Sequence, residues 1–266
     1  MELSFIKNDN FKESLFQIGY FFCLWNIFYF VIHKVFLFSK TRKIDLDIKN
    51  RIVSIMHGTL SFLFSTIFIY HFGIDFDLPI DILSTKLVSL SLGYFLYDLI
   101  ACLWFGLWDS KLIIHHVLAI SGFFFPFIAG KGIFAGIIGL FMAESSNFPM
   151  HFRVILKQLG LRHTKAYELF DDMYFAIYIF ARGICCPIFC TMSFFSKDTP
   201  LFICFVFAAM TIQSLHFIKI MFKILKKKNR EKLERKSKGV ELFWTSMNPR
   251  IEELSYFKKK SKSNIF

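Results

Sequence analysis

Near-continuous runs of hydrophobic residues, separated by short polar segments, dominate this chain of 266 residues. Each run is about 18–24 residues long, the length that a helix needs to cross a bilayer core of about 30 Å. Segments this apolar satisfy their own backbone groups in lipid only as helices. The pattern therefore predicts an all-α, polytopic membrane protein in which seven transmembrane helices form one bundle. The predicted spans are 16–38, 52–71, 86–105, 112–129, 132–149, 173–195 and 201–224.

The spans divide the chain into three regions. Residues 1–50 hold an N-terminal segment and the first helix, residues 51–225 form a membrane domain of six helices, and residues 226–266 form a basic tail. Within the tail, the stretch 240–257 is expected either to lie on the membrane surface or to be disordered, and Pro249 interrupts any helix there.

Lysine and arginine are distributed unevenly among the loops. The segments 39–51 and 150–172 are rich in them and the tail is richest, whereas the segment 72–85 is acidic and has none. Segments rich in lysine and arginine alternate with segments poor in them, as expected when seven spans place successive loops on opposite sides of the membrane. Because basic loops stay on the cytosolic side, we predict a lumenal N-terminus and a cytosolic C-terminus.

The formal net charge of +12 invites a nucleic-acid reading, but the charge is concentrated. Basic residues cluster at 223–238, directly after the last span, and again at 258–262. Such a cluster is typical of a cytosolic flank that contacts anionic lipid, so we expect no nucleic-acid partner. The six cysteines fall inside apolar runs and form no ligand-like pair, which favours free buried thiols and no metal site.

Several ionisable side chains lie inside the predicted spans, where they are costly and usually face a bundle interior. The predicted orientation places them all on the cytosolic side of the midplane. We therefore expect one polar cavity that opens toward the cytosol and is walled by Phe and Leu. Its candidate residues are Asp98, His115, His116, Glu144, Arg182 and His216, with His57 near a span edge and with neutral Tyr94, Asn147 and Gln213.

Structural alternatives exist for several of these residues. His57 and His216 are either cavity or packing residues, and Arg182 can form a structural ion pair with Asp98 or Glu144. Lys219 is interpreted as a snorkelling residue. The glycines of the run 132–139 indicate close helix packing. Asp171 and Asp172 are interpreted as acids at the N-terminus of the sixth span. The adjacent His115 and His116 point about 100° apart on their helix, so one can face the cavity while the other braces a neighbouring helix.

The chain resembles TLC-domain proteins, which include the ceramide synthases. In that family a histidine pair is followed by a glycine 20 residues later and by acidic positions after 28 and 31 residues. Counted from His116, these positions are Gly136, Glu144 and Asn147. The "GYFLYDLI" stretch with Asp98 and the "ARGICCPI" stretch with Arg182 are also similar to the family. The resemblance covers about residues 50–225.

The resemblance implies a role in lipid homeostasis, with membrane lipid or acyl-CoA as the partner and no metal. Two readings stay open. One is an intramembrane pocket that binds a lipid or acyl-CoA without chemistry. The other is an acyltransferase of the ceramide synthase type that takes acyl-CoA as donor. In that case His115 or His116 acts as base or nucleophile, Glu144 orients an imidazole, and Asp98 and Arg182 complete the network.

The remaining candidates, Tyr94, His57, Asn147 and His216, would hold the lipid or acyl-CoA together with Arg182. Ceramide synthases have aspartate at the positions of Glu144 and Asn147, so the sequence is more similar to a smaller branch that is distinct from them. By resemblance the compartment is the endoplasmic reticulum or another endomembrane. A homo-oligomer stays open, and a transporter or seven-helix receptor is a weaker reading.

Overall fold

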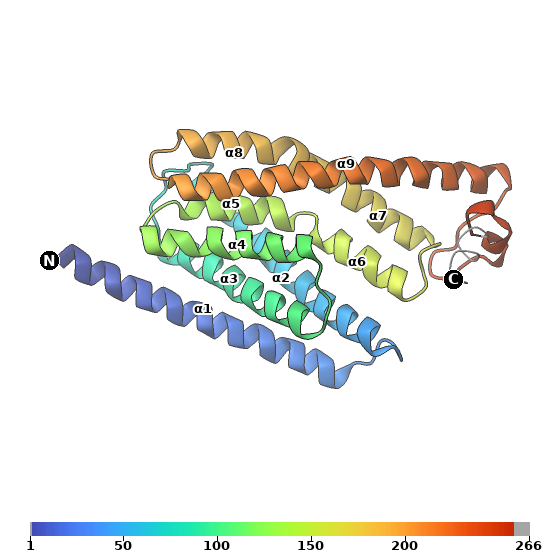
Figure 1. The fold of residues 1–266 in the computed structure, drawn as a ribbon, viewed down its shortest axis with the longest axis horizontal. Coiled ribbons are helices and arrows are strands. Elements are labelled where there is room, and N and C mark those ends of the chain that lie inside the picture. Colours follow the sequence, from blue (N-terminus) through green and yellow to red (C-terminus); the bar gives the residue numbers. More distant parts are fainter. Residues whose placement is uncertain (1, 258–266) are drawn as a thin grey trace.

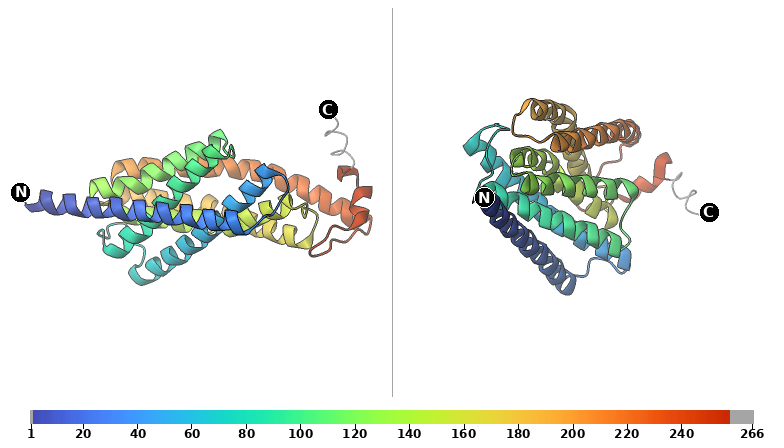
Figure 2. Two further views of the ribbon diagram at one scale, coloured as in Figure 1. Left: turned by 90° about the horizontal axis from the view of Figure 1, so that it is seen from below. Right: turned by 60° about the vertical axis from the view of Figure 1, so that its left-hand side comes forward.

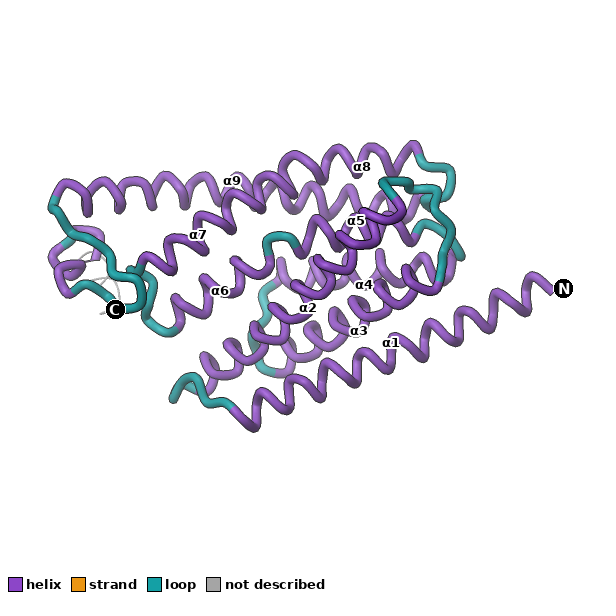
Figure 3. Tube along the Cα trace, turned by 180° about the vertical axis from the view of Figure 1, so that it is seen from behind, coloured by secondary structure: helices purple, strands orange, loops and turns teal. Residues whose placement is uncertain are grey.

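The computed structural model describes residues 2–257, with side chains from residue 11 onward, and that part of the chain is helical without strands (Figures 1 and 3). The predicted basic cluster at 258–262 lies outside the described residues. The long helices are α1 (Glu2–Val35), α2 (Arg42–Phe72), α3 (Ile82–Trp104), α4 (Ser110–Ala129) and α9 (Leu201–Ser237). Shorter elements are α5 (Ile133–Glu144), α6 (Asn147–Gln158), α7 (Lys165–Tyr178), a π-helix (Ile179–Cys185), α8 (Cys186–Phe195) and a 3₁₀ helix (Pro249–Glu253).

The structure confirms the predicted class. Seven helical segments among the described residues are long and apolar enough to cross a membrane. Their bounds are Phe11–Val35, Arg42–Phe72, Ile82–Trp104, Ser110–Ala129, Ile133–Gln158, Lys165–Phe195 and Leu201–Ser237. The fifth combines α5 with α6, and the sixth combines α7, the π-helix and α8. Most segments extend beyond the predicted edges, because hydropathy marks the apolar part of a helix and not its end.

The helices run along the long axis of the molecule, with α1 at one edge and α9 at the opposite side (Figures 1 and 2). The first helix packs mainly against α3. Gly93 of α3 permits this approach, because a Cβ atom there would lie 2.8 Å from the backbone nitrogen of Phe22. The indole nitrogen of Trp25 donates to the Leu90 carbonyl at 3.2 Å and fixes the register of the two helices.

Replacing Gly93 with alanine should destabilise the bundle by about 1–3 kcal/mol, the usual cost of overpacking. Gly19 on α1 is the matched control, since a Cβ there meets nothing within 4 Å. Gly19→Ala should stabilise slightly, because alanine is the better helix former. Thermal unfolding of both variants in one detergent measures the difference. Equal melting temperatures would show that α1 does not depend on the close contact.

The C-terminal region folds back on the bundle, so the stretch 240–257 is ordered and the expectation of a disordered tail is wrong. Val240, Leu242, Ile251 and Leu254 form a small buried cluster. The backbone nitrogen of Lys165 donates to the Phe243 carbonyl at 2.8 Å, which docks this lobe onto the start of α7. Hydropathy alone does not indicate this lobe, because its few apolar residues are separated by polar ones and meet only when the segment folds back on itself.

Charged side chains join α6, α7 and the end of α9. Asp171 accepts from Arg153 at 2.5 Å and from Lys228 at 2.6 Å. Asp172 accepts from Lys228 at 2.7 Å and from Lys232 at 2.9 Å. The interpretation of the two aspartates as helix-opening acids is wrong: α7 begins at Lys165, and the acids pair with basic side chains of neighbouring helices.

Candidate functional site

Two adjoining cavities lie among α3, α4, α5, α9 and the π-helix, and α6 and α7 complete the wall of one of them. The polar chamber has about 960 Å³ of empty space and the apolar chamber about 650 Å³, counting the space at their mouths. Asp109 and Lys111, at the start of α4, line only the polar chamber, and Phe123 and Ile203 line only the apolar chamber. The cavities share four lining residues: Phe95, His115, Arg182 and Ser214.

Most of the predicted site residues meet at the polar chamber. Its lining includes Tyr94, Asp98, His115, His116, Glu144, Asn147 and Arg182. Two predicted residues do not line either cavity. His57 is fully buried behind the chamber, and His216 is exposed on the outward face of α9. Lys219 is exposed on that outward face as well.

His116 has both ring nitrogens engaged. Its Nδ1 lies 2.8 Å from the Leu112 carbonyl oxygen, which can only accept, so Nδ1 carries a hydrogen. Its Nε2 lies 2.7 Å from Oδ2 of Asp98. The other Asp98 oxygen accepts from the Asn50 amide at 2.6 Å, and Asn50 in turn accepts from the Tyr97 hydroxyl at 2.8 Å. This network fixes the His116 ring and leaves it no nitrogen for chemistry.

His115 differs from its neighbour. Its ring lies nearly perpendicular to that of His116, with centroids 5.8 Å apart, and it lines both cavities. Arg182 and Gln213 lie near it. The expectation that one histidine faces the cavity while the other braces a neighbouring helix matches this geometry: His115 faces the cavity, and His116 is bonded to Asp98 on α3.

Arg182 is a buried cation without a carboxylate partner among residues 11–257. Its guanidinium donates to the Ala143 carbonyl at 3.1 Å and to the Ser214 hydroxyl at 3.4 Å, while its Nε has no hydrogen-bond partner in the described part of the chain. The residue lies in the π-helix, a distortion frequently found at functional sites. The suggested ion pair with Asp98 or Glu144 is not formed.

Glu144 contacts a histidine other than the predicted pair. Its Oε2 accepts from the Asn147 amide and lies 3.9 Å from Nδ1 of His57. Gly58 makes room for this contact, because a Cβ there would lie 2.8 Å from the same carboxylate oxygen. Asp98, and not Glu144, therefore orients a member of the His115/His116 pair. His57 itself stacks on Tyr94, with ring centroids 3.7 Å apart.

Sequence reasoning named His57 but missed the rest of the polar face of α2. Buried Asn50, Ser54, His57, Ser61 and Ser65 follow one another at spacings of three or four residues. Ser54 accepts from the Tyr94 hydroxyl at 2.8 Å, and Ser61 bonds the His57 ring at 2.9 Å. The spacing itself was a visible signal, because residues three and four apart share one helix face.

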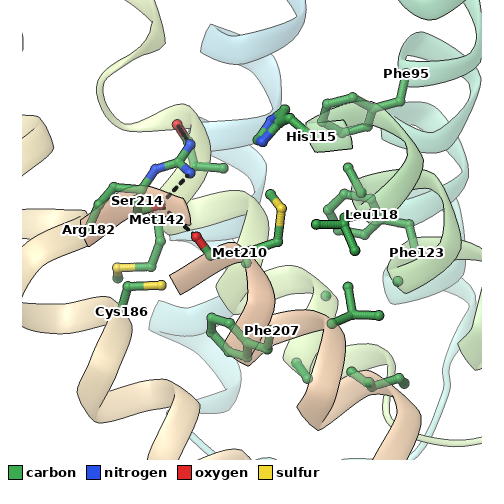
Figure 4. A pocket seen from close by; sticks show the side chains of 18 residues that line it. Phe95, His115, Leu118, Phe123, Met142, Arg182, Cys186, Phe207, Met210 and Ser214 are labelled. Atoms are coloured by element: carbon green, nitrogen blue, oxygen red, sulfur yellow. Dashed lines mark hydrogen bonds between the residues drawn. The ribbon is translucent and has the colours of Figure 1, made fainter. Parts of the chain in front are cut away.

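The apolar chamber extends away from the polar one, between α4, α5 and α9. Figure 4 shows His115 and Arg182 at one end of it, with Phe207, Met210 and Phe123 along its walls. Gly136 and Gly139 also line it. A Cβ at Gly136 would lie 3.3 Å from the Phe123 ring, whereas one at Gly139 would meet nothing within 4 Å, so the close-packing interpretation does not hold for Gly139. Within residues 2–257, no group of three or more His, Cys, Asp or Glu side chains is arranged to hold a metal ion.

The fold and the site define a multi-pass membrane protein whose spans enclose a polar chamber next to an apolar one. A family model for the TLC domain, shared by TRAM, LAG1 and CLN8 proteins, matches residues 47–226. The chain belongs to the TLC-domain family. The match runs from α2 into α9 and leaves out α1 and the C-terminal lobe.

Proposed function

We propose that this protein binds an acyl-chain ligand inside the membrane domain, with acyl-CoA as the preferred candidate. The observation that carries the proposal is the junction of the two chambers, where His115 and Arg182 line both. A thioester has a polar carbonyl between an apolar chain and a polar headgroup, and the two chambers offer the same sequence of environments. The bound molecule would serve membrane lipid homeostasis.

The dimensions of the apolar chamber suit an extended hydrocarbon chain. Along α4 its lining runs from His115 to Phe123, a rise of about 12 Å. Along α9 it runs from Ser214 to Ile203, a rise of about 16 Å. Apart from Arg182, His115 and Ser214 its walls are apolar or glycine, so each methylene that enters leaves water at a gain of about 0.8 kcal/mol.

Arg182 supplies the polar half of the recognition. A buried charge is costly unless it is paired, and this guanidinium has only a carbonyl and a hydroxyl as partners in the described chain. The Arg182 side chain lines both chambers, so it lies at their junction. A ligand carbonyl or phosphate oxygen placed there would complete the hydrogen bonding of the guanidinium.

The test is native mass spectrometry of the full-length protein in mild detergent, followed by titration with palmitoyl-CoA. We expect a retained acyl-chain ligand and tighter binding of palmitoyl-CoA than of coenzyme A alone. Arg182→Gln should weaken binding about 10–100-fold, the value of a hydrogen bond to a charged group. Lys197→Gln, at the far end of the bundle, is the control. Equal binding of coenzyme A and palmitoyl-CoA would refute a ligand site in the apolar chamber.

A second candidate function, acyl transfer, is favoured by the position of the His115 ring, which lines both chambers beside Gln213. A neutral ring nitrogen would attack the thioester carbonyl carbon, forming an N–C bond and breaking the C–S bond. Coenzyme A would leave as the thiol after taking the proton of the ring. An acceptor amine or hydroxyl would then attack the acyl-imidazole and return its proton to His115. His116 would act as a positioning residue.

The proposed site also bears on topology. The start of α4 lines the polar chamber, and α4 begins after a loop that the lysine and arginine distribution assigns to the cytosolic side. We therefore place the chamber mouth on the cytosolic face of the endoplasmic reticulum or another endomembrane, where acyl-CoA would enter. Protease protection of tagged N- and C-termini in sealed microsomes measures this orientation.

A further inference from the structure

The basic residues at the end of α9 separate onto two faces of the helix. One face turns toward α7 and is neutralised there. Lys228 and Lys232 pair with the adjacent aspartates of α7, and Arg235 pairs with Glu168. These three cations are therefore committed to holding the helices together.

The other face carries an outer basic stripe, which consists of Lys223, Lys226, Lys227 and Arg230. All four side chains are exposed, and none forms an ion pair within residues 11–257. Their spacing of three, four and seven residues places them on one helix face. Four like charges this close repel one another, so the stripe favours a negatively charged partner.

The position of the stripe indicates which partner it meets. Along the apolar part of α9 the exposed residues include Phe205, Ile212 and Phe222, a surface suited to hydrocarbon. Ile212 follows Phe205 by seven residues and Lys226 follows Ile212 by fourteen, so the basic stripe continues the apolar face in nearly the same direction. A face that changes from apolar to basic at the end of a membrane span meets lipid headgroups.

Most of the stripe points away from the cavities. Ser214 and Phe217 line the polar chamber, and Lys223 and Lys226 follow them by nine residues each, which is about 180° around the helix. Lys227 follows the chamber residue Gln213 by fourteen residues and is separated from it along the helix axis, by about 21 Å. A ligand headgroup inside the chamber therefore meets the opposite side of α9, and the stripe is left for the surrounding bilayer.

We propose that the outer basic stripe binds the phosphate groups of anionic membrane lipids at the point where α9 leaves the bilayer. The proposal goes beyond the acyl-chain site and does not depend on it. Each Lys or Arg near an anionic surface contributes roughly a fivefold gain in binding. The lipids would fix the depth of α9, whose inner face is tied to α7.

The experiment uses the full-length protein in neutral detergent, titrated with fluorescent phosphatidylserine and, separately, with phosphatidylcholine. We expect selective binding of phosphatidylserine that disappears near 1 M salt, where the Debye length is about 3 Å. The variant K223Q/K226Q/K227Q/R230Q should lose at least about tenfold in affinity. K223R/K226R/K227R should bind as the parent does, because it retains the charge. K86Q/K131Q/K197Q, which removes exposed lysines elsewhere, should also bind as the parent does.

Three results would overturn the proposal. They are equal binding of both lipids, undiminished selectivity in the fourfold variant, and displacement of phosphatidylserine by coenzyme A at constant ionic strength. The last result would assign the stripe to a soluble ligand. Retention of palmitoyl-CoA by the fourfold variant is the separate readout of the acyl-chain site, so the failure of one proposal is distinguishable from the failure of the other.

Discussion

Replacement of His115 by alanine should lower acyl transfer about 10²–10⁴-fold, the contribution of a positioned acid, base or nucleophile. The ring faces both chambers, contacts Gln213 of α9 and takes no part in the Asp98 hydrogen bonds, so its loss should leave the fold intact. The measurement is the transfer of labelled palmitate from its CoA thioester to an endogenous lipid acceptor, together with the mass of a trapped acyl adduct on the protein.

His216→Ala is the matched control for this prediction. It removes a histidine in a membrane span as well, but one exposed on the outward face of α9. Its activity should equal that of the parent. Full transfer by His115→Ala would exclude His115 chemistry, while loss of palmitoyl-CoA binding in the same variant would instead assign His115 to ligand recognition.

Replacement of Asp98 by alanine should reduce the free energy of unfolding by about 3–5 kcal/mol, the cost of removing one partner from a buried ion pair. The substitution leaves Nε2 of His116 and the amide of Asn50 without acceptors in a buried position. Thermal or denaturant unfolding in a single detergent measures the loss.

Asp98→Asn serves as the graded comparison. Its amide oxygen can still accept from Asn50, and its amide nitrogen can donate to a neutral His116, so it should lose less stability than alanine does. The double variant Asp98→Ala/His116→Ala should be less destabilised than the sum of its single variants, because the two side chains share one interaction. Additive losses would show that the pair contributes nothing through its contact.

The sequence predicted the number of spans and the meeting of distant polar residues, because both follow from hydropathy and from the cost of charge in lipid. The partners within the site were less predictable. Spacing places Glu144 and Asn147 on one helix face. It does not reveal that this face turns toward His57, or that His116 bonds Asp98 instead of Glu144. That choice depends on helix rotation, which is set by close contacts such as that of Gly58.

The C-terminal lobe is a second example of contacts that the sequence pattern does not predict. The apolar residues of 240–257 cluster with one another, and backbone carbonyls of the segment accept from the start of α7; neither contact is visible in a hydropathy profile. Similarly, the basic residues of 223–238 form one continuous cluster in the sequence. Only the positions of Asp171, Asp172 and Glu168 divide that cluster into a neutralised face and a free one.

The π-helix at Ile179–Cys185 has a practical consequence for future mutagenesis. A scan that numbers the sixth span as an uninterrupted helix would assign the wrong direction to every side chain after Arg182, because the wider turns shift the phase by about one residue. In a cysteine-accessibility scan, the periodic pattern of accessible positions after Arg182 should therefore be out of phase with the pattern before it. Chimeras that exchange this segment should keep its length unchanged.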